Sequence, residues 1–242
     1  MRSLRVVLMA ASVLSMVSVQ AQTADEIINK HIEALGGKDK VAGIKTLYTE
    51  YDMEVMGQQA PGITWLVNGK AFKNEVNFGG QKIIQVVTDK DGWAQNPMMG
   101  QATPVAMPAD QVKISQANLD PGGPLFNYAA KGYTVELAGK ENVNGKEAYK
   151  LTAKGKDTAT VSTFWIDPST WYIVKSTSKS NMNGAEMETS LTFSNYKKTD
   201  YGFVTPYNME MSMPQGFTLN IVSKKVEVNK EIDMKLFEMP KQ

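Results

Sequence analysis

The sequence of 242 residues contains no cysteine, one histidine and only two arginines, Arg2 and Arg5. The absence of cysteine excludes disulfides, thiol catalysis and thiolate metal sites, and also the cysteine that anchors a bacterial lipoprotein. After residue 5 the chain contains no arginine, whose planar guanidinium group is what carboxylate and phosphate sites normally use. These absences argue against a thiol enzyme, a lipid-anchored protein and a site built around phosphate.

The single histidine, His31, is the only imidazole available for catalysis. A Ser-His-Asp triad would have to use it, yet it lies on or beside the apolar stripe of a predicted helix, which favours a structural role. One histidine without cysteine leaves only carboxylates as metal ligands. We therefore expect no catalytic residue, no metal site, no cofactor and no enzyme activity. Carboxylate pairs across strands stay open, because the sequence does not fix strand register.

The first 21 residues have the pattern of a secretory signal peptide. Arg2 and Arg5 precede the apolar stretch 6–19, and a small-residue cleavage pattern ends at Ala21. This stretch is shorter than the roughly 20 residues that a spanning helix needs. Residues 22–242 keep 24 of the 26 basic residues and all 25 acidic ones, so their net charge is −1. We expect a soluble periplasmic protein without stable membrane insertion and without a nucleic-acid partner.

Residues 22–242 predict a single domain that is mainly β, with helices. Thr23 and Glu26 have capping-box spacing, which predicts an N-terminal helix that ends at Gly36-Gly37. From Thr46 onward apolar and polar residues alternate, and Asn-Gly turns recur, as in an antiparallel meander. We expect about eleven strands in one large curved sheet, an unclosed β-barrel.

A long excursion, residues 96–132, interrupts the meander with five prolines and two helix-like pieces, Ala109 to Asn118 and Pro124 to Ala130. Long excursions in compact domains are usually functional. We interpret this one as a helical lid insertion, with a simple covering of one sheet face as the alternative.

Methionine is unusually frequent, with 15 residues in the chain, and Met209, Met211 and Met213 alternate along one predicted strand. Thioether side chains adapt to irregular guests, although they also fill loosely shaped cores. We interpret the methionines of strand and lid as lining a ligand cavity, which two tryptophans could share. The predicted ligand-binding residues are Trp65, Trp93, Met98, Met99, Met209, Met211 and Met213.

Five segments of the chain carry a resemblance to known proteins: TADEIINKHIEALGGKDKVAGIKTL, DGWAQNP, FWIDPSTWYIVKSTS, YGFVTPY and VEVNKEIDMKLFEMP. Together they resemble the periplasmic outer-membrane lipoprotein-sorting and lipoprotein-carrier (LolA/LolB-like) family. The resemblance implies an unclosed β-barrel with a helical lid over a hydrophobic cavity for acyl chains. The family's carrier holds its lid with an arginine, and no arginine after residue 5 can take that role here.

We therefore expect a monomeric periplasmic carrier that holds an acyl chain or another hydrophobic ligand on the concave side of the sheet. The lipid of a lipoprotein is one such ligand. The alternative is a cell-envelope protein-interaction module whose barrel is filled by its own side chains.

Overall fold

The computed structural model describes residues 22–55, 57–155, 161–182, 185–212, 216 and 218–240. The predicted signal peptide, residues 1–21, and the predicted ligand-binding residue Met213 lie outside these ranges. The side chains of residues 180–187 lie outside the description as well.

The helical elements confirm the predicted N-terminal helix. Thr23 caps it, accepting from the Glu26 amide while the Glu26 carboxylate accepts from the Thr23 amide, each at 3.2 Å. The α-helices are α1 (Ala24–Ala34), α2 (Lys38–Ala42) and α3 (Ala109–Ser115). The 3-10 helices are η1 (Pro97–Met99), η2 (Gln116–Leu119) and η3 (Met234–Phe237).

All thirteen described strands form one antiparallel sheet that is not closed into a barrel. The strands are β1 (Thr46–Val55), β2 (Gln58–Val67), β3 (Ala71–Phe78), β4 (Gln81–Thr88), β5 (Gly92–Asn96), β6 (Gln101–Ala106), β7 (Thr134–Val143), β8 (Lys146–Lys154), β9 (Val161–Ile166), β10 (Ile173–Met182), β11 (Ala185–Lys198), β12 (Val204–Ser212) and β13 (Thr218–Val228). The predicted mainly-β fold with helices is thus confirmed, with two strands more than expected.

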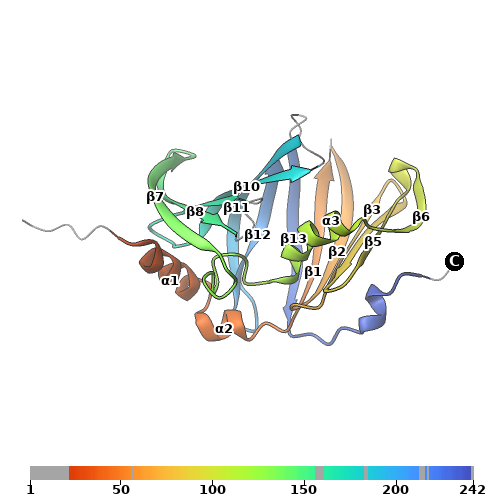
Figure 1. The fold of residues 1–242 in the computed structure, drawn as a ribbon, viewed down its shortest axis with the longest axis horizontal. Coiled ribbons are helices and arrows are strands. Elements are labelled where there is room, and N and C mark those ends of the chain that lie inside the picture. Colours follow the sequence, from red (N-terminus) through yellow and green to blue (C-terminus); the bar gives the residue numbers. More distant parts are fainter. Residues whose placement is uncertain are drawn as a thin grey trace, which may run out of the picture.

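The chain runs through the sheet in two meanders (Figure 1). It starts in the middle at β1 and passes strand by strand to β6 at one edge. The connection 107–133, which we call the crossover, then carries the chain to β7 at the opposite edge. From β7 the chain returns to the middle, where β13 pairs with β1.

Two details of the predicted insertion are wrong. Residues 101–106 form the edge strand β6, and residues 124–130 form successive turns instead of a helix. Pro124 opens these turns and Asn127 adopts a left-handed backbone, with φ of 51°, which interrupts helical geometry. The helix predicted from Ala109 is present as α3, followed directly by η2.

Two faces of the sheet are covered by different elements. The inner face, as we call the face that carries α1 and α3, packs Ile27, Ile28 and Ile32 of α1 against strands β8 and β9. The crossover also lies on this face, where the Gln85 side chain on β4 bonds the Ser115 hydroxyl at 3.5 Å. The opposite, outer face is covered near β3 to β5 by the C-terminal segment, whose Phe237 is buried.

His31 is buried on the underside of α1, and its Nδ1 donates a 2.8 Å hydrogen bond to the Trp171 carbonyl. Trp171 has a φ of 61°, which is uncommon for a bulky residue and is held by this bond and by stacking on Tyr149. Burial lowers the pKa of His31 and outweighs the opposing effect of the bond to Trp171. The histidine therefore anchors α1 to the sheet in its neutral form.

This burial predicts acid sensitivity. Because the folded pKa is below that of the unfolded chain, the stabilisation is complete above about pH 6.5 and is lost progressively as the pH falls. We expect the free energy of unfolding to fall between pH 7 and pH 5 by at most about 1.4 kcal/mol per pH unit from this residue. Urea titrations should show a flatter pH profile for His31→Gln. If the free energy of unfolding depended equally on pH in both proteins, His31 would not be the source of the acid sensitivity.

Candidate functional site

The strand register brings apolar side chains into line across the centre of the inner face. One row runs through neighbouring strands β2, β1, β13, β12 and β11 as Ala60, Met53, Ile221, Met209 and Phe193. The next row continues from β13 to β8 as Leu219, Met211, Leu191, Ser176, Phe164 and Leu151. Met53, Ile221, Met209 and Met211 are only half-buried. The centre of the inner face is therefore an apolar surface that the described residues leave partly open.

Charged side chains of the same central strands point the other way. In the described parts of β1 to β4, β12 and β13, the register places the charged residues on the outer face. The consecutive Lys224 and Lys225 share this face because the register of β13 shifts opposite Glu50 and Tyr51. Ion pairs form there, including Asp52 with Lys224 at 2.8 Å and Glu75 with Lys82 at 2.7 Å. Burial alone would raise the pKa of Glu75, but its bonds to Lys82 and Lys73 lower it overall. The apolar rows are thus kept free of these charges.

On the neighbouring strand β11, by contrast, the charged residue Lys197 lies on the inner face. Its partner in the register is Thr205, two residues along β12 from Tyr207, and its ammonium lies 4.7 Å from the centroid of the Tyr207 ring. The side chain is exposed, so water screens its charge.

Tyr51 builds the floor of the inner face beside the apolar rows. A Cβ on Gly62, its partner on β2, would lie 2.3 Å from the Tyr51 ring, so the ring lies flat across this glycine. Its hydroxyl donates a 2.6 Å hydrogen bond to Oδ1 of Asn74 on β3. Burial raises the pKa of Tyr51 to about 12, more than the bond to Asn74 lowers it. Tyr51 is therefore a neutral donor at neutral pH.

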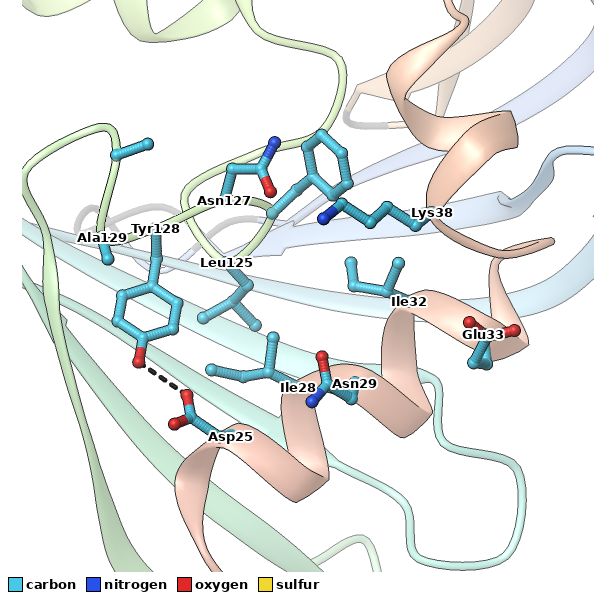
Figure 2. Close-up of a pocket in the computed structure, with 12 residues that line it drawn as sticks. Asp25, Ile28, Asn29, Ile32, Glu33, Lys38, Leu125, Asn127, Tyr128 and Ala129 are labelled. Atoms are coloured by element: carbon cyan, nitrogen blue, oxygen red, sulfur yellow. Dashed lines mark hydrogen bonds between the residues drawn. The ribbon is translucent and has the colours of Figure 1, made fainter.

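A pocket of about 440 Å³ lies between α1 and the crossover (Figure 2). Its floor is formed by Ile28, Ile32, Leu125 and Phe126, all of them buried. The volume lies within the range of small-molecule sites, about 300–1,000 Å³. The crossover therefore does not close completely against α1, and the pocket lies between these two segments.

The rim of this pocket is polar and exposed. At one end the Tyr128 hydroxyl donates a 2.6 Å hydrogen bond to Asp25 Oδ1, which ties the crossover to the first turn of α1. This bond, helped by partial burial, raises the pKa of Tyr128. Lys38 and Asn127 lie at the other end (Figure 2). The pocket can thus accept an apolar group from solvent without breaking the core below it.

The structure brings together only some of the predicted ligand-binding residues. Met209 and Met211 share the inner face, as their alternation predicts. Trp65 and Trp93 lie on the opposite face, so the interpretation that they share a surface with the methionines is wrong. Trp93 is buried under the C-terminal segment and donates a 3.0 Å hydrogen bond to the Phe237 carbonyl. Aromatic bulk alone could not tell the two faces apart.

Met98 and Met99 lie at the tip of the β5–β6 hairpin, in η1. They are 57% and 79% exposed and so line no enclosed cavity. The residues of the pocket floor were missed by sequence reasoning. The apolar stripe of α1, together with the Pro-Leu-Phe segment of the crossover, is the signal that could have found them.

Among the described residues there is no group of three or more His, Cys, Asp or Glu side chains that could hold a metal ion. Within the same ranges, no helix is both long and apolar enough to span a membrane.

Comparisons with known proteins identify the fold. A family model described as "-like: Uncharacterized protein" matches residues 72–241. None of the curated proteins matches the chain. A LolA superfamily protein from Nitrosomonas europaea has a similar structure, with 14% identity and a TM-score of 0.58, over 90% of this chain and 98% of that one.

Two further structures have comparable similarity, with TM-scores of 0.58 and 0.55. A DUF1329 family protein from Desulfovibrio piger has 17% identity and a TM-score of 0.58, over 88% of this chain and 96% of that one. A domain described as an outer membrane lipoprotein-sorting protein, from Vibrio parahaemolyticus, has 14% identity and a TM-score of 0.55, over 88% of this chain and 94% of that one. At these identities the likeness shows the fold alone.

The close contact between Tyr51 and Gly62 predicts a strong coupling. Gly62→Ala should destabilise the protein by about 1–3 kcal/mol, because the new methyl group displaces the Tyr51 ring. In a Tyr51→Leu background the same change should cost clearly less. Chemical denaturation of the four proteins in this double-mutant cycle measures the difference. Equal costs in both backgrounds would show that Tyr51 does not occupy this space.

The hydrogen bond between Tyr128 and Asp25 predicts a local effect on the crossover. Tyr128→Phe should speed amide hydrogen exchange in residues 125–132 while lowering global stability by no more than about 1 kcal/mol, since the bond is exposed. Tyr133→Phe, which removes a hydroxyl nearby in the chain, serves as the control. Unchanged exchange in Tyr128→Phe would mean that the bond does not hold the crossover.

Proposed function

Because the chain belongs to the family whose model matches residues 72–241, a LolA-like family of uncharacterized proteins, we propose that it is a carrier for a hydrophobic ligand. The ligand, an acyl chain or a similar apolar body, lies on the inner face. The observation that carries this proposal is the apolar row from Ala60 to Phe193, which is half-buried at Met53, Ile221 and Met209. The described charged side chains of β1, β2, β12 and β13 lie on the outer face, whereas Lys197 of β11 lies on the inner face.

The dimensions of the row suit an acyl chain. Five strands separated by about 4.8 Å give a row about 19 Å long. One leaflet of a bilayer, half of its hydrocarbon core of about 30 Å, is about 15 Å thick. A chain that fills one leaflet therefore fits along the row, across the strands.

The energetics are adequate without a charged clamp. Burying about fourteen methylenes at roughly 0.8 kcal/mol each gives about 11 kcal/mol before the costs of ordering. Methionine side chains of the two rows can adjust to chains of different shape, since thioethers are flexible. Affinity then depends on apolar area, and the lack of arginine in residues 22–242 is no obstacle.

The alternative of a self-filled barrel requires a closed interior. Half-burial of Met53, Ile221, Met209 and Met211, and the pocket between α1 and the crossover, favour the carrier instead.

Our proposal extends to processing and location. Residues 1–21 act as a signal peptide, and residues 22–242 act as one exported domain, a soluble monomer in the periplasm. Support comes from the basic and apolar pattern of residues 1–21. N-terminal sequencing and cell fractionation test both statements.

The carrier function is tested by the lipids that accompany the protein. Protein purified without detergent should release acyl lipids that mass spectrometry detects. Met211→Asp should remain folded by circular dichroism and lose at least about ten-fold of this lipid, because a carboxylate disfavours an apolar neighbour. Val222→Asp on the outer face, where Val222 is 38% exposed, is the matched control and should keep its lipid.

Two outcomes would contradict the carrier. Wild-type protein that is free of lipid and ignores fatty-acid and lipopeptide probes has no such function. Unfolding of Met211→Asp, with Val222→Asp folded, would mean that Met211 is core and that the barrel fills itself.

A further inference from the structure

The inner face also carries a row of uncharged polar side chains beside the apolar rows. The register aligns Gln85 on β4, Asn74 on β3, Thr64 on β2 and Thr49 on β1, each opposite the next. All four are half-buried. We call them the neutral polar row. Polar groups of this kind inside an apolar enclosure fix the orientation of ligands in small-molecule sites.

The fold uses these groups only in part. Asn74 accepts from Tyr51 through Oδ1, which directs its amide NH₂ group away from that contact. Gln85 makes a long bond of 3.5 Å to Ser115 on α3. Thr49 and Thr64 make no side-chain hydrogen bond with another described residue. Hydrogen-bond donors and acceptors of this row are therefore available to a ligand, on a face whose other side chains are mostly apolar.

From this row we infer that the ligand is an uncharged amphiphile, in which an ester or hydroxyl group bonds the neutral polar row and the chain follows the apolar rows. The inference rests on the proposed carrier function and adds the chemical class of its ligand. Thr and Asn side chains both donate and accept, which matches an ester carbonyl and a free hydroxyl. A mono- or diacylglycerol has both groups.

Charge argues against a buried fatty-acid or phosphate anion. In β1 to β4 and β13 the described charged side chains lie on the outer face, so an anion beside the neutral polar row would find on these strands no cation to compensate its lost hydration. In the crossover, Asp120 and Lys131 pair with one another, and Asp110 and Lys113 lie exposed on α3.

Lys197 is the rival recognition element. It lies three strands from Thr49, about 14 Å at 4.8 Å per strand, and is exposed over Tyr207. If the head group of the ligand bound at Lys197, anionic ligands would be favoured and the head group would not contact the neutral polar row. The two assignments thus predict opposite preferences for the same chain.

The test is a competition with ligands that share one palmitoyl chain. Delipidated protein is loaded with the fluorescent probe 1-N-phenylnaphthylamine at pH 8 and titrated with monopalmitoylglycerol, palmitate or palmitoyl lysophosphatidylglycerol. We expect monopalmitoylglycerol to displace the probe at a concentration about ten-fold lower than palmitate does, because the anion stays partly hydrated. The lysophospholipid should behave like palmitate.

Matched variants locate the preference. The double variant Thr49→Val with Thr64→Val keeps the shape of both side chains and removes both hydroxyls. It should weaken the binding of monopalmitoylglycerol about five-fold and leave the binding of palmitate unchanged. Thr64→Ser, which keeps a hydroxyl, should retain the preference of the wild type. Thr192→Val on the outer face is the control for the substitution of threonine by valine. Lys197→Gln should not alter the binding of monopalmitoylglycerol. The single valine variants report on the same hydroxyls if the double variant is unstable.

The failures are distinguishable. Palmitate that competes as well as the glyceride, and loses this ability in Lys197→Gln, overturns the inference and leaves the carrier function standing. A glyceride preference that survives both threonine substitutions overturns the role of the row. Protein that binds neither probe nor ligand overturns the carrier function as well.

Discussion

The alternation of side chains along an uninterrupted antiparallel sheet is the constraint on which the rest of the structure depends. Because the described strands pair in one continuous order from β6 to β7, a residue's position in its strand assigns it to one face of the whole molecule. A shift of one residue would exchange Met209 with Glu210 and move a charge onto the apolar row. The strand register therefore determines the separation of apolar side chains on one face from charged side chains on the other.

The two faces are closed by different means. On the outer face Phe237 fills a hollow among Ala71, Val86 and Trp93, and the C-terminal segment is fixed there by a hydrogen bond from the Trp93 indole. On the inner face α1 makes a dense core with β8 and β9, while the crossover leaves a pocket beside α1. The outer face is thus sealed near β3 to β5 and the inner face is not.

The fold could be predicted from the sequence because its signals are local. The capping box at Thr23, the Asn-Gly turns and the period of two each depend on a few neighbouring residues. Strand β6 was missed because its short run contains Pro104 and is followed closely by a helix-like segment. The turns at residues 124–130 depend on a left-handed Asn127, which no local pattern announces.

The candidate site was predicted only where it follows from alternation. Met209 and Met211 were placed on one face by their spacing, and the structure agrees. The face on which a tryptophan lies depends on which strand pairs with which, and Trp65 and Trp93 were therefore misplaced. The neutral polar row needs the registers of four strands at once, so no single segment of sequence reveals it.

The pairing of β1 with β13 has a consequence for how the chain acquires its structure. Each meander contains only neighbouring hairpins and can form early, whereas the seam joins Leu47 to Val228, near opposite ends of the described chain. Contacts this distant in sequence form slowly, since a long loop must be closed first. β1 therefore stays unpaired on one side until β13 is available. The central seam delays completion of the sheet until nearly all of the described chain can take part in pairing.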